Sequence, residues 1–246
     1  MNYAIKTMCE HRTYRHFDPD FVLPPKDLEL ILQSARQAPS WMNGQHVSII
    51  NVRDMNLRRE IVKKQPGSPQ IGTCSVFLFF VGDLYRASLC AGSLGSEFLS
   101  IGNADSLITM VTDASLVAQN ALVAAESLGY GTCMVGGLRL LCAELIEWFK
   151  LPRYTFPLFG LCIGKLEVEM KVKPRLPRQA CVFDDFYQTE GMEEQLAAYE
   201  KTMVEFAEAR ETLPYREKFA RFYAKDFAAS NNELLVRQGL LTRMNR

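Results

Sequence analysis

The amino-acid sequence predicts an α+β sandwich, and three observations support this prediction. Two segments, Cys74–Val81 and Phe156–Gly164, are nearly all apolar and have the length of strands that are buried on both faces. Leu107–Leu128 has apolar residues around most of its helical circumference, which is typical of a central, buried helix. Helices and strands alternate without regular strand–helix–strand units, which favours an α+β sandwich over a doubly wound sheet.

Composition and charge narrow the class of protein further. The chain has 246 residues, of which 48% are hydrophobic and 23% are charged, as in ordinary globular proteins. Lys plus Arg is 28 and Asp plus Glu is 28, so no global attraction to nucleic acid or to an anionic membrane is indicated. We find no apolar run long enough to span a bilayer and no secretion signal in Met1–Glu10. We therefore expect a cytoplasmic protein with no nucleic-acid or membrane partner.

The first half of the chain is expected to begin with a short helix at Tyr3–Glu10. Apolar residues at helical spacing predict a second helix at Lys26–Gln37, which follows two prolines and precedes a third. Val47–Val52 is expected to be a strand and Leu57–Lys64 a helix. Gln65–Gly72 is rich in Pro and Gly, which predicts a loop before the first buried strand.

In the second half, Gly129 follows the predicted central helix at the position that favours a left-handed residue. A short strand is expected at Thr132–Val135, a turn at Gly136–Gly137 and a helix at Leu140–Phe149. Lys165–Pro177 is expected to be an extended basic segment, before amphipathic helices at Met192–Arg210 and Tyr215–Ala229. We predict one domain, residues 1–246, with a helical C-terminal extension over residues 190–246.

Several common motifs are incomplete in this sequence. Gly129-Tyr130-Gly131 begins like a dinucleotide fingerprint, but Met134 stands where Gly or Ala is needed, and these glycines close a helix instead of opening one. Neither a phosphate-binding loop ending in Gly-Lys-Ser/Thr nor a nucleophile elbow occurs. The 3 histidines do not stand at ligand spacing with carboxylates, and the 7 cysteines form no metal-binding or redox pair. We therefore predict no metal site, and free thiols that are mostly buried.

Two basic clusters lie far apart in the sequence. One contains His11, Arg12 and Arg15, and the other contains Lys173 and Arg175 between prolines. Side chains at positions 173 and 175 point the same way on an extended chain. Arg forks match phosphate oxygens and Lys supplies a point charge, so the two clusters together are able to hold a phosphate. Each cluster alone is more often a solvated surface.

Two other segments each have two interpretations. The loop Ala38–Gln45 is rich in side chains that hydrogen-bond a planar heterocycle, but on physical grounds alone a plain helix stop and turn is preferred. Gly136 and Gly137 either let the backbone approach a flat ring closely or form only a tight turn.

These segments stand in an order that resembles the flavin-dependent nitroreductase family. The similarity is greatest to its branch of NADPH-dependent nitroreductases and flavin reductases with a long C-terminal extension. It covers about residues 10–187 closely and the extension loosely. The segments that carry it are His11–Arg15, Ala38–Gln45, Ala118–Gly129, Val135–Arg139, Pro157–Gly164 and Lys173–Pro177.

The resemblance implies a nitroreductase-like three-layer sandwich with a mostly antiparallel central sheet flanked by helices. It also implies a homodimer, with Leu107–Leu128 in the dimer core and one FMN per subunit in the subunit interface. The flavin carries the chemistry, so no catalytic side chain is expected. The residues expected near the FMN phosphate and ribityl chain are His11, Arg12, Thr13, Arg15, Lys173 and Arg175. Those expected along the ring are Val135, Gly136 and Gly137, with Pro39, Ser40, Met42 and Asn43 from the opposite subunit.

The sequence departs from the family pattern at several positions. Thr13 stands where Ser is usual, which preserves the hydroxyl. Ser68 stands near a position where a flavin-contacting Gln is common, and Trp41 is bulkier than the small polar residue often found there. In the extension, Arg210 and Arg216 are the expected NADPH contacts, but acidic residues surround them. The preference for NADPH over NADH is therefore left open.

The resemblance implies an enzyme in which reduced nicotinamide, NADPH or NADH, delivers hydride to FMN and leaves before a small acceptor enters. The expected acceptors are nitroaromatics, quinones, free flavin and azo compounds. One alternative is a non-enzymatic module that binds or supplies flavin on the same fold. Another is a different reaction on this fold, such as reductive dehalogenation or flavin fragmentation.

Overall fold

The computed structural model describes residues 1–207 and 213–242, and the chain forms two compact units. The first unit consists of Met1–Met170 and the segment from Ala228 onward, and the second unit is Lys171–Phe227. The predicted start of the C-terminal extension at residue 190 coincides with neither boundary. The last helix of the chain belongs to the first unit.

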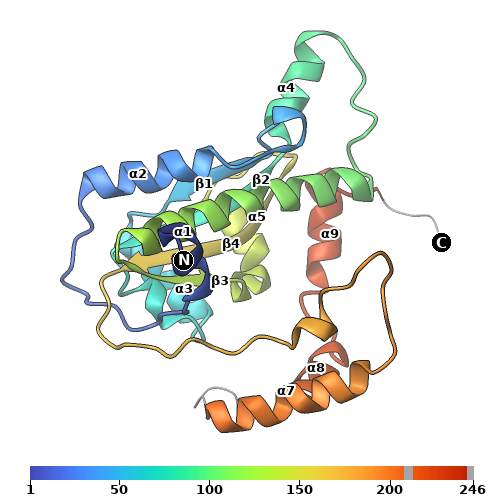
Figure 1. The fold of residues 1–246 in the computed structure, drawn as a ribbon. Coiled ribbons are helices and arrows are strands. Elements are labelled where there is room, and N and C mark those ends of the chain that lie inside the picture. The colour runs from blue at the N-terminus through green and yellow to red at the C-terminus, as the bar shows by residue number, and fades with distance from the viewer. Residues whose placement is uncertain (208–212, 243–246) are drawn as a thin grey trace. The chain divides into compact units, whose positions relative to one another are not determined.

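The first unit contains a four-stranded antiparallel sheet (Figure 1). Its strands are β1 (Val47–Asn51), β2 (Val76–Asp83), β3 (Gly131–Val135) and β4 (Thr155–Gly164), in the order β1-β2-β4-β3. Each predicted strand is confirmed to within two residues at either end. The two nearly all-apolar segments are the two central strands, because only central strands between two helix layers bury both faces.

A bulge lies in the middle of the central strand pair. Phe80 pairs with Phe159, but the next residue, Val81, pairs with Pro157, so β4 has one extra residue at Leu158. Proline has no backbone N–H to donate and is normally excluded from central strands. The bulge interrupts the hydrogen-bond ladder at the point where Pro157 enters it, so the strand tolerates the proline.

The alternating side chains of β2 define three layers. Val76, Leu78 and Phe80 pack into a core with α2 (Pro25–Arg36) and α5 (Ala104–Ser127), which lie side by side over one face of the sheet (Figure 1). Phe77, Phe79 and Val81 pack into a second core with α3 (Met55–Lys64) and α6 (Cys142–Trp148). The predicted α+β sandwich with its helix–sheet–helix layering is confirmed.

Helix α5 differs from its prediction in two respects. Its sheet-facing side is fully buried at Met110, Ala114 and Ala118, but Ile108 on the other side is 63% exposed. By length and composition alone α5 is also apolar enough to cross a membrane, so the expectation that no run is long enough was wrong. Its packing on the sheet and its buried Asp113 are those of a core helix. Gly129 ends the helix region with φ of 87°, as predicted.

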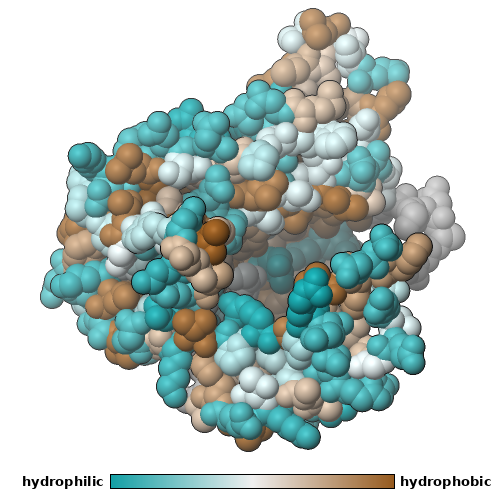
Figure 2. Space-filling model, viewed as in Figure 1, coloured by the Kyte–Doolittle hydropathy of each residue, from teal (hydrophilic) through white to brown (hydrophobic). Residues whose placement is uncertain are grey.

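Two helices of the first unit were not predicted. Helix α4 (Tyr85–Ser93) projects from the end of β2 (Figure 1), and Figure 2 shows apolar surface on this projection, where Leu89 is 54% exposed. Helix α9 (Ser230–Arg237) packs its Leu234 against the core near Met110. Both are short, and neither has the long apolar stripe that made α5 visible.

The remaining helical elements of the first unit are short. Helix α1 (Tyr3–Cys9) confirms the first predicted helix. Three-residue and five-residue 3-10 turns form at η1 (Trp41–Asn43), η2 (Pro69–Ile71) and η3 (Gly137–Leu141). The last of these explains why the helix predicted from Leu140 begins only at Cys142.

The second unit contains η4 (Arg178–Ala180), α7 (Met192–Phe206) and α8 (Tyr215–Tyr223). The predicted end of its first helix at Arg210 lies outside the described residues. Helix α8 ends six residues before the predicted Ala229, and α9 starts only at Ser230. Tyr199 and Tyr215 meet edge to face at 5.5 Å and hold α7 against α8.

Candidate functional site

The N-terminal basic cluster lies along an edge strand of the sheet. Thr13 forms a parallel bridge with Thr132, and the Tyr14 N–H donates to the Thr132 carbonyl at 2.8 Å. The Tyr14 side chain is buried in the core beneath β3. The segment His11–Arg15 is therefore fixed by backbone pairing at one side and by a buried aromatic ring.

Two members of this cluster already have acidic partners. His11 Nδ1 lies 2.7 Å from Oε1 of Glu126, and Arg12 Nη1 lies 3.4 Å from Oε1 of Glu169. Burial raises the pKa of Tyr14, whose hydroxyl lies between Arg12 and Glu169, and Arg12 opposes this shift. Sequence reasoning missed both carboxylates, because Glu126 and Glu169 stand more than a hundred residues from the cluster in sequence.

The same cluster retains donors without acceptors. The Arg12 Nε is buried and has no hydrogen-bond partner. Arg15 is partly exposed and makes no hydrogen bond or ion pair with any residue in the described ranges 1–207 and 213–242. Buried polar groups are normally satisfied, and guanidinium groups match phosphate oxygens. The donor set of this cluster therefore fits a phosphate group.

The glycine pair lies at the other end of β3. A Cβ atom on Gly136 would meet nothing within 4 Å, so open space adjoins its backbone. A Cβ atom on Gly137 would lie 2.8 Å from Nε2 of Gln65, which donates to the Gly137 carbonyl at 3.3 Å. Val135, before the pair, is buried. Open space beside Gly136 fits the close approach of a flat ring, whereas a side chain at Gly137 would have to displace the end of the Gln65 side chain.

The segment before β2 has two buried polar residues beside this region. Ser68, the predicted flavin contact, is only 6% exposed and begins η2. Gln70 is buried, and its Oε1 has no hydrogen-bond partner. Neither Gln65 nor Gln70 was singled out from the sequence, because isolated glutamines in a Pro/Gly-rich loop carry no pattern. The Ser68 contact stays a prediction.

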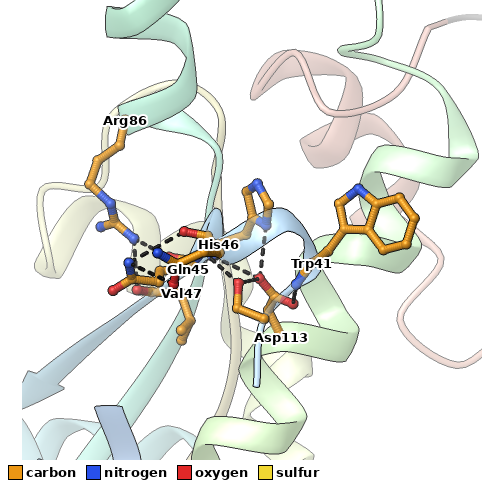
Figure 3. A network of polar contacts seen from close by, with 8 residues as sticks. Trp41, Gln45, His46, Val47, Arg86 and Asp113 are labelled. Carbon is orange, nitrogen blue, oxygen red and sulfur yellow. Dashed lines mark hydrogen bonds and ion pairs between the residues drawn. The ribbon is translucent and has the colours of Figure 1, made fainter. Parts of the chain in front are cut away.

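The loop predicted to reach an opposite subunit presents its side chains outward. Met42 is 86% exposed, and Pro39 and Asn43 are also exposed. Ser40 instead turns inward, where its hydroxyl donates to Asp113 Oδ2 at 2.6 Å. Figure 3 shows Asp113 among Trp41 and His46 of the same loop region. Asp113 was not singled out from the sequence, because it interrupts an otherwise apolar helix without any motif.

The other predicted cations belong to the second unit. Lys173 and Arg175 follow one another closely, with Arg175 Nη1 donating to the Lys173 carbonyl at 3.1 Å. Their convergence with the N-terminal cluster stays a prediction. Arg216 is bound by Glu200, with Nη2 2.7 Å from Oε2, and Glu200 raises the pKa of Arg216. Arg210 lies outside the described residues.

Two family models together match most of the chain. The model of the nitroreductase family matches residues 9–165, and that of the nitroreductase family C-terminal domain matches residues 173–243. The chain therefore belongs to the nitroreductase family. The second match spans the second unit and α9, which explains the long extension.

Individual relatives resemble the chain over nearly its full length. An FMN reductase [NAD(P)H] of Bacillus subtilis is 34% identical over 97% of this chain and 98% of the relative. An oxygen-insensitive NADPH nitroreductase of Salmonella typhimurium is 32% identical over 99% and 100%. The solved structure of the hypothetical oxidoreductase YcnD from Bacillus subtilis is 31% identical, with a TM-score of 0.94 over 99% of this chain and 100% of that one.

Proposed function

We propose that this chain is an FMN-dependent NAD(P)H oxidoreductase that reduces nitroaromatics, quinones or free flavin. The observation that carries the proposal is the pair of guanidinium groups at the edge of β3. Arg12 has a buried Nε without an acceptor, and Arg15 makes no hydrogen bond or ion pair with any of the described residues. They belong to a chain whose full-length relatives include an FMN reductase and an NADPH nitroreductase. FMN has the phosphate that such donors require.

The chain's own residues bind and orient the cofactor. The cations of the N-terminal cluster hold the phosphate, with Thr13 as a hydroxyl donor and with Lys173 and Arg175 from the second unit. Gly136 lets the flat ring approach the backbone beside β3. When bound, FMN carries electrons from reduced nicotinamide to the acceptor, so the protein supplies binding, orientation and electrostatics. No side chain has to act as a nucleophile or as a general base.

The proposal includes a cytoplasmic homodimer in which each site draws on both subunits. Ile108, Val111 and Leu116 are exposed along the outer side of α5, and an exposed apolar helix face is typical of a subunit interface. Met42 and Asn43 are exposed in a loop that we place in the opposite subunit's site. Light scattering should give twice the chain mass of 27.9 kDa. A monomer that still holds FMN would contradict the shared site.

The experiment that tests the function is steady-state oxidation of NADPH and NADH by the purified, flavin-loaded protein. The acceptor panel contains a nitrofuran, a naphthoquinone, an azo dye and free riboflavin. We expect acceptor-dependent oxidation with parallel double-reciprocal lines, because nicotinamide leaves before the acceptor binds. Tight FMN binding without acceptor-dependent oxidation would instead identify a flavin-binding or flavin-supplying module.

A further inference from the structure

Residues 40–46, which we call the Trp41 loop, have a conformation that requires support from the rest of the fold. Met42, Asn43 and Gln45 have φ angles of 50°, 56° and 52°. This left-handed region is uncommon for residues other than glycine and costs free energy at each position. Within the loop, the backbone forms bonds from Asn43 to Ser40 at 3.1 Å and from Gly44 to Trp41 at 2.8 Å. Contacts from outside the loop must supply the remaining stabilisation.

Asp113 of α5 ties both ends of the Trp41 loop to one carboxylate. Its Oδ2 accepts from the Ser40 hydroxyl at 2.6 Å and from the His46 N–H at 3.0 Å, and the His46 Nδ1 lies 2.8 Å from it. Its Oδ1 accepts from the Trp41 N–H at 3.1 Å. The residue is 1% exposed, and burial disfavours its charged form, but these hydrogen bonds outweigh burial and lower its pKa.

Arg86 of α4 holds the loop from the opposite side (Figure 3). Its Nη2 donates to the carbonyls of Gln45 and Val47, the latter at 2.9 Å. Its Nη1 binds Asp83 Oδ2 at 2.7 Å, which fixes the guanidinium to the end of β2. The loop is therefore held between a buried anion on one helix and an anchored cation on another.

Trp41 takes part in the contacts from Asp113 and Arg86 only through its backbone, and its indole lies outside them. Figure 3 shows the Trp41 indole pointing away from the network, on the opposite side of Asp113 from Arg86, and the side chain is 66% exposed. A backbone held at both ends beneath an exposed indole limits the positions that its flat π-surface can take. Aromatic rings stack on such a surface, whereas ions without an aromatic face do not.

We propose that Asp113 and Arg86 are positioning residues that fix the Trp41 indole as the stacking surface for planar aromatic acceptors. The inference rests on the proposed function, in which the Trp41 loop borders the flavin site of the opposite subunit. This role requires no contact between Asp113 or Arg86 and the acceptor or the cofactor. They act through the backbone of the Trp41 loop.

The test measures the Trp41 indole directly and then acceptor use by the same flavin-loaded protein. The chain has 2 tryptophans, so a Trp148→Phe background leaves Trp41 as the sole tryptophan, which excitation at the red edge of indole absorption separates from tyrosine. We expect Asp113→Asn to lower the fluorescence anisotropy of Trp41 and to raise its quenching by acrylamide. Asp105→Asn removes an exposed carboxylate from the first turn of the same helix and should change neither.

In turnover, Asp113→Asn should raise the KM for a planar nitroaromatic about tenfold, the effect of one lost contact. The KM for hexacyanoferrate(III), which has no aromatic face, should change by less than about twofold. Trp41→Ala should have the same effect, and Asp113→Asn should add nothing further in a Trp41→Ala chain, because both changes remove the same contact. Additive effects, or a folded Asp113→Asn variant with unchanged anisotropy, would overturn the proposal.

A second variant, Arg86→Met, tests the proposal independently of Asp113, and fluorescence tests it independently of activity. If Asp113→Asn does not fold, Arg86→Met decides the question, since Arg86 is exposed and belongs to none of the three hydrophobic clusters. It should lower the anisotropy and raise the nitroaromatic KM in the same direction, and no change in either would overturn the proposal. A protein that oxidises no NAD(P)H with any acceptor would refute the proposed function, whereas the fluorescence results would still report whether these residues position Trp41.

Discussion

Two groups of arginines in this chain carry similar charge but differ in what neutralises them. At the edge of β3, Arg15 has no partner among the residues the structure describes, and Arg12 keeps a buried Nε without an acceptor. In the second unit, Arg216 donates from Nε and Nη2 to one carboxylate, Glu200, at 3.1 and 2.7 Å. Arg221 is likewise paired with Glu217.

The difference shows that unpaired donors, more than charge count, indicate an anion site. An arginine already bound by a carboxylate has to break that ion pair before it binds a phosphate, whereas an arginine without an acceptor gains a bond outright. The N-terminal cluster is therefore suited to the FMN phosphate. The second unit is expected to discriminate only weakly for the 2′-phosphate that distinguishes NADPH from NADH.

The largest expected effect follows from removing Arg15, which has no partner among the described residues, or Arg12, whose Nε has no acceptor. Arg15→Ala or Arg12→Ala each removes a charge-assisted bond worth roughly 1.5–3 kcal/mol, so FMN affinity should fall by about tenfold to a hundredfold. Fluorescence titration of the apoprotein with FMN measures this. Arg53→Ala, at an exposed arginine between β1 and α3, is the matched control. Native affinity in both cluster variants would remove the phosphate assignment.

A smaller loss is expected from the second cluster. Arg175 is exposed and already donates to the Lys173 carbonyl, so Arg175→Ala should weaken FMN binding by about tenfold or less. The same titration tests it. An effect as large as that of Arg15→Ala would show that both clusters contribute equally to phosphate binding. If Arg175→Ala leaves FMN affinity unchanged, the second cluster does not bind the cofactor.

The sequence predicted the core better than the site, for a physical reason. Burial requires apolar residues in a recognisable pattern. Continuous apolar runs placed β2 and β4, and apolar residues around a helical circumference placed α5, each to within a few residues. The basic cluster was visible as a run of cations, and the family resemblance assigned it to the FMN phosphate. Its partners Glu126 and Glu169 were missed, because side chains that meet only after folding leave no local pattern. Helix α4 was missed for a related reason: it projects from the fold and buries no residue of its own.

The ion pair between Arg216 and Glu200 provides a finer test. Arg216→Ala should raise the KM for NADPH by about two- to fivefold, because an exposed charge contributes little, and leave the KM for NADH nearly unaltered. Glu200→Gln frees Arg216 and should lower the KM for NADPH by a similar factor. A wild-type preference for NADPH beyond about a thousandfold would contradict this account, because several converging cations would be needed. Equal use of both nicotinamides with no response to Arg216→Ala would show that this residue does not reach the ribose.

The smallest expected effect is the loss at low pH of the stability that Asp113 contributes. Hydrogen bonds hold the pKa of Asp113 below its ordinary value of 3.8 despite burial, so its carboxylate stabilises the fold at neutral pH. Since the folded-state pKa is the lower one, this contribution is present above the unfolded-state pKa and is lost as pH falls through the folded-state pKa. The difference in urea midpoint between wild type and Asp113→Asn should stay constant from pH 7 to about pH 5 and close only at lower pH. A difference that closes near pH 6 would assign the effect to another group.

The most direct test of the central claim compares two ligands that differ only by the phosphate. We propose that the Arg12 Nε and the Arg15 guanidinium, which have no acceptor among the described residues, form the FMN phosphate site. Titration of the apoprotein should therefore show FMN binding at least about a hundredfold more tightly than riboflavin, and Arg15→Ala should reduce that ratio by about tenfold or more. Equal affinities for FMN and riboflavin in the wild-type protein would contradict the account.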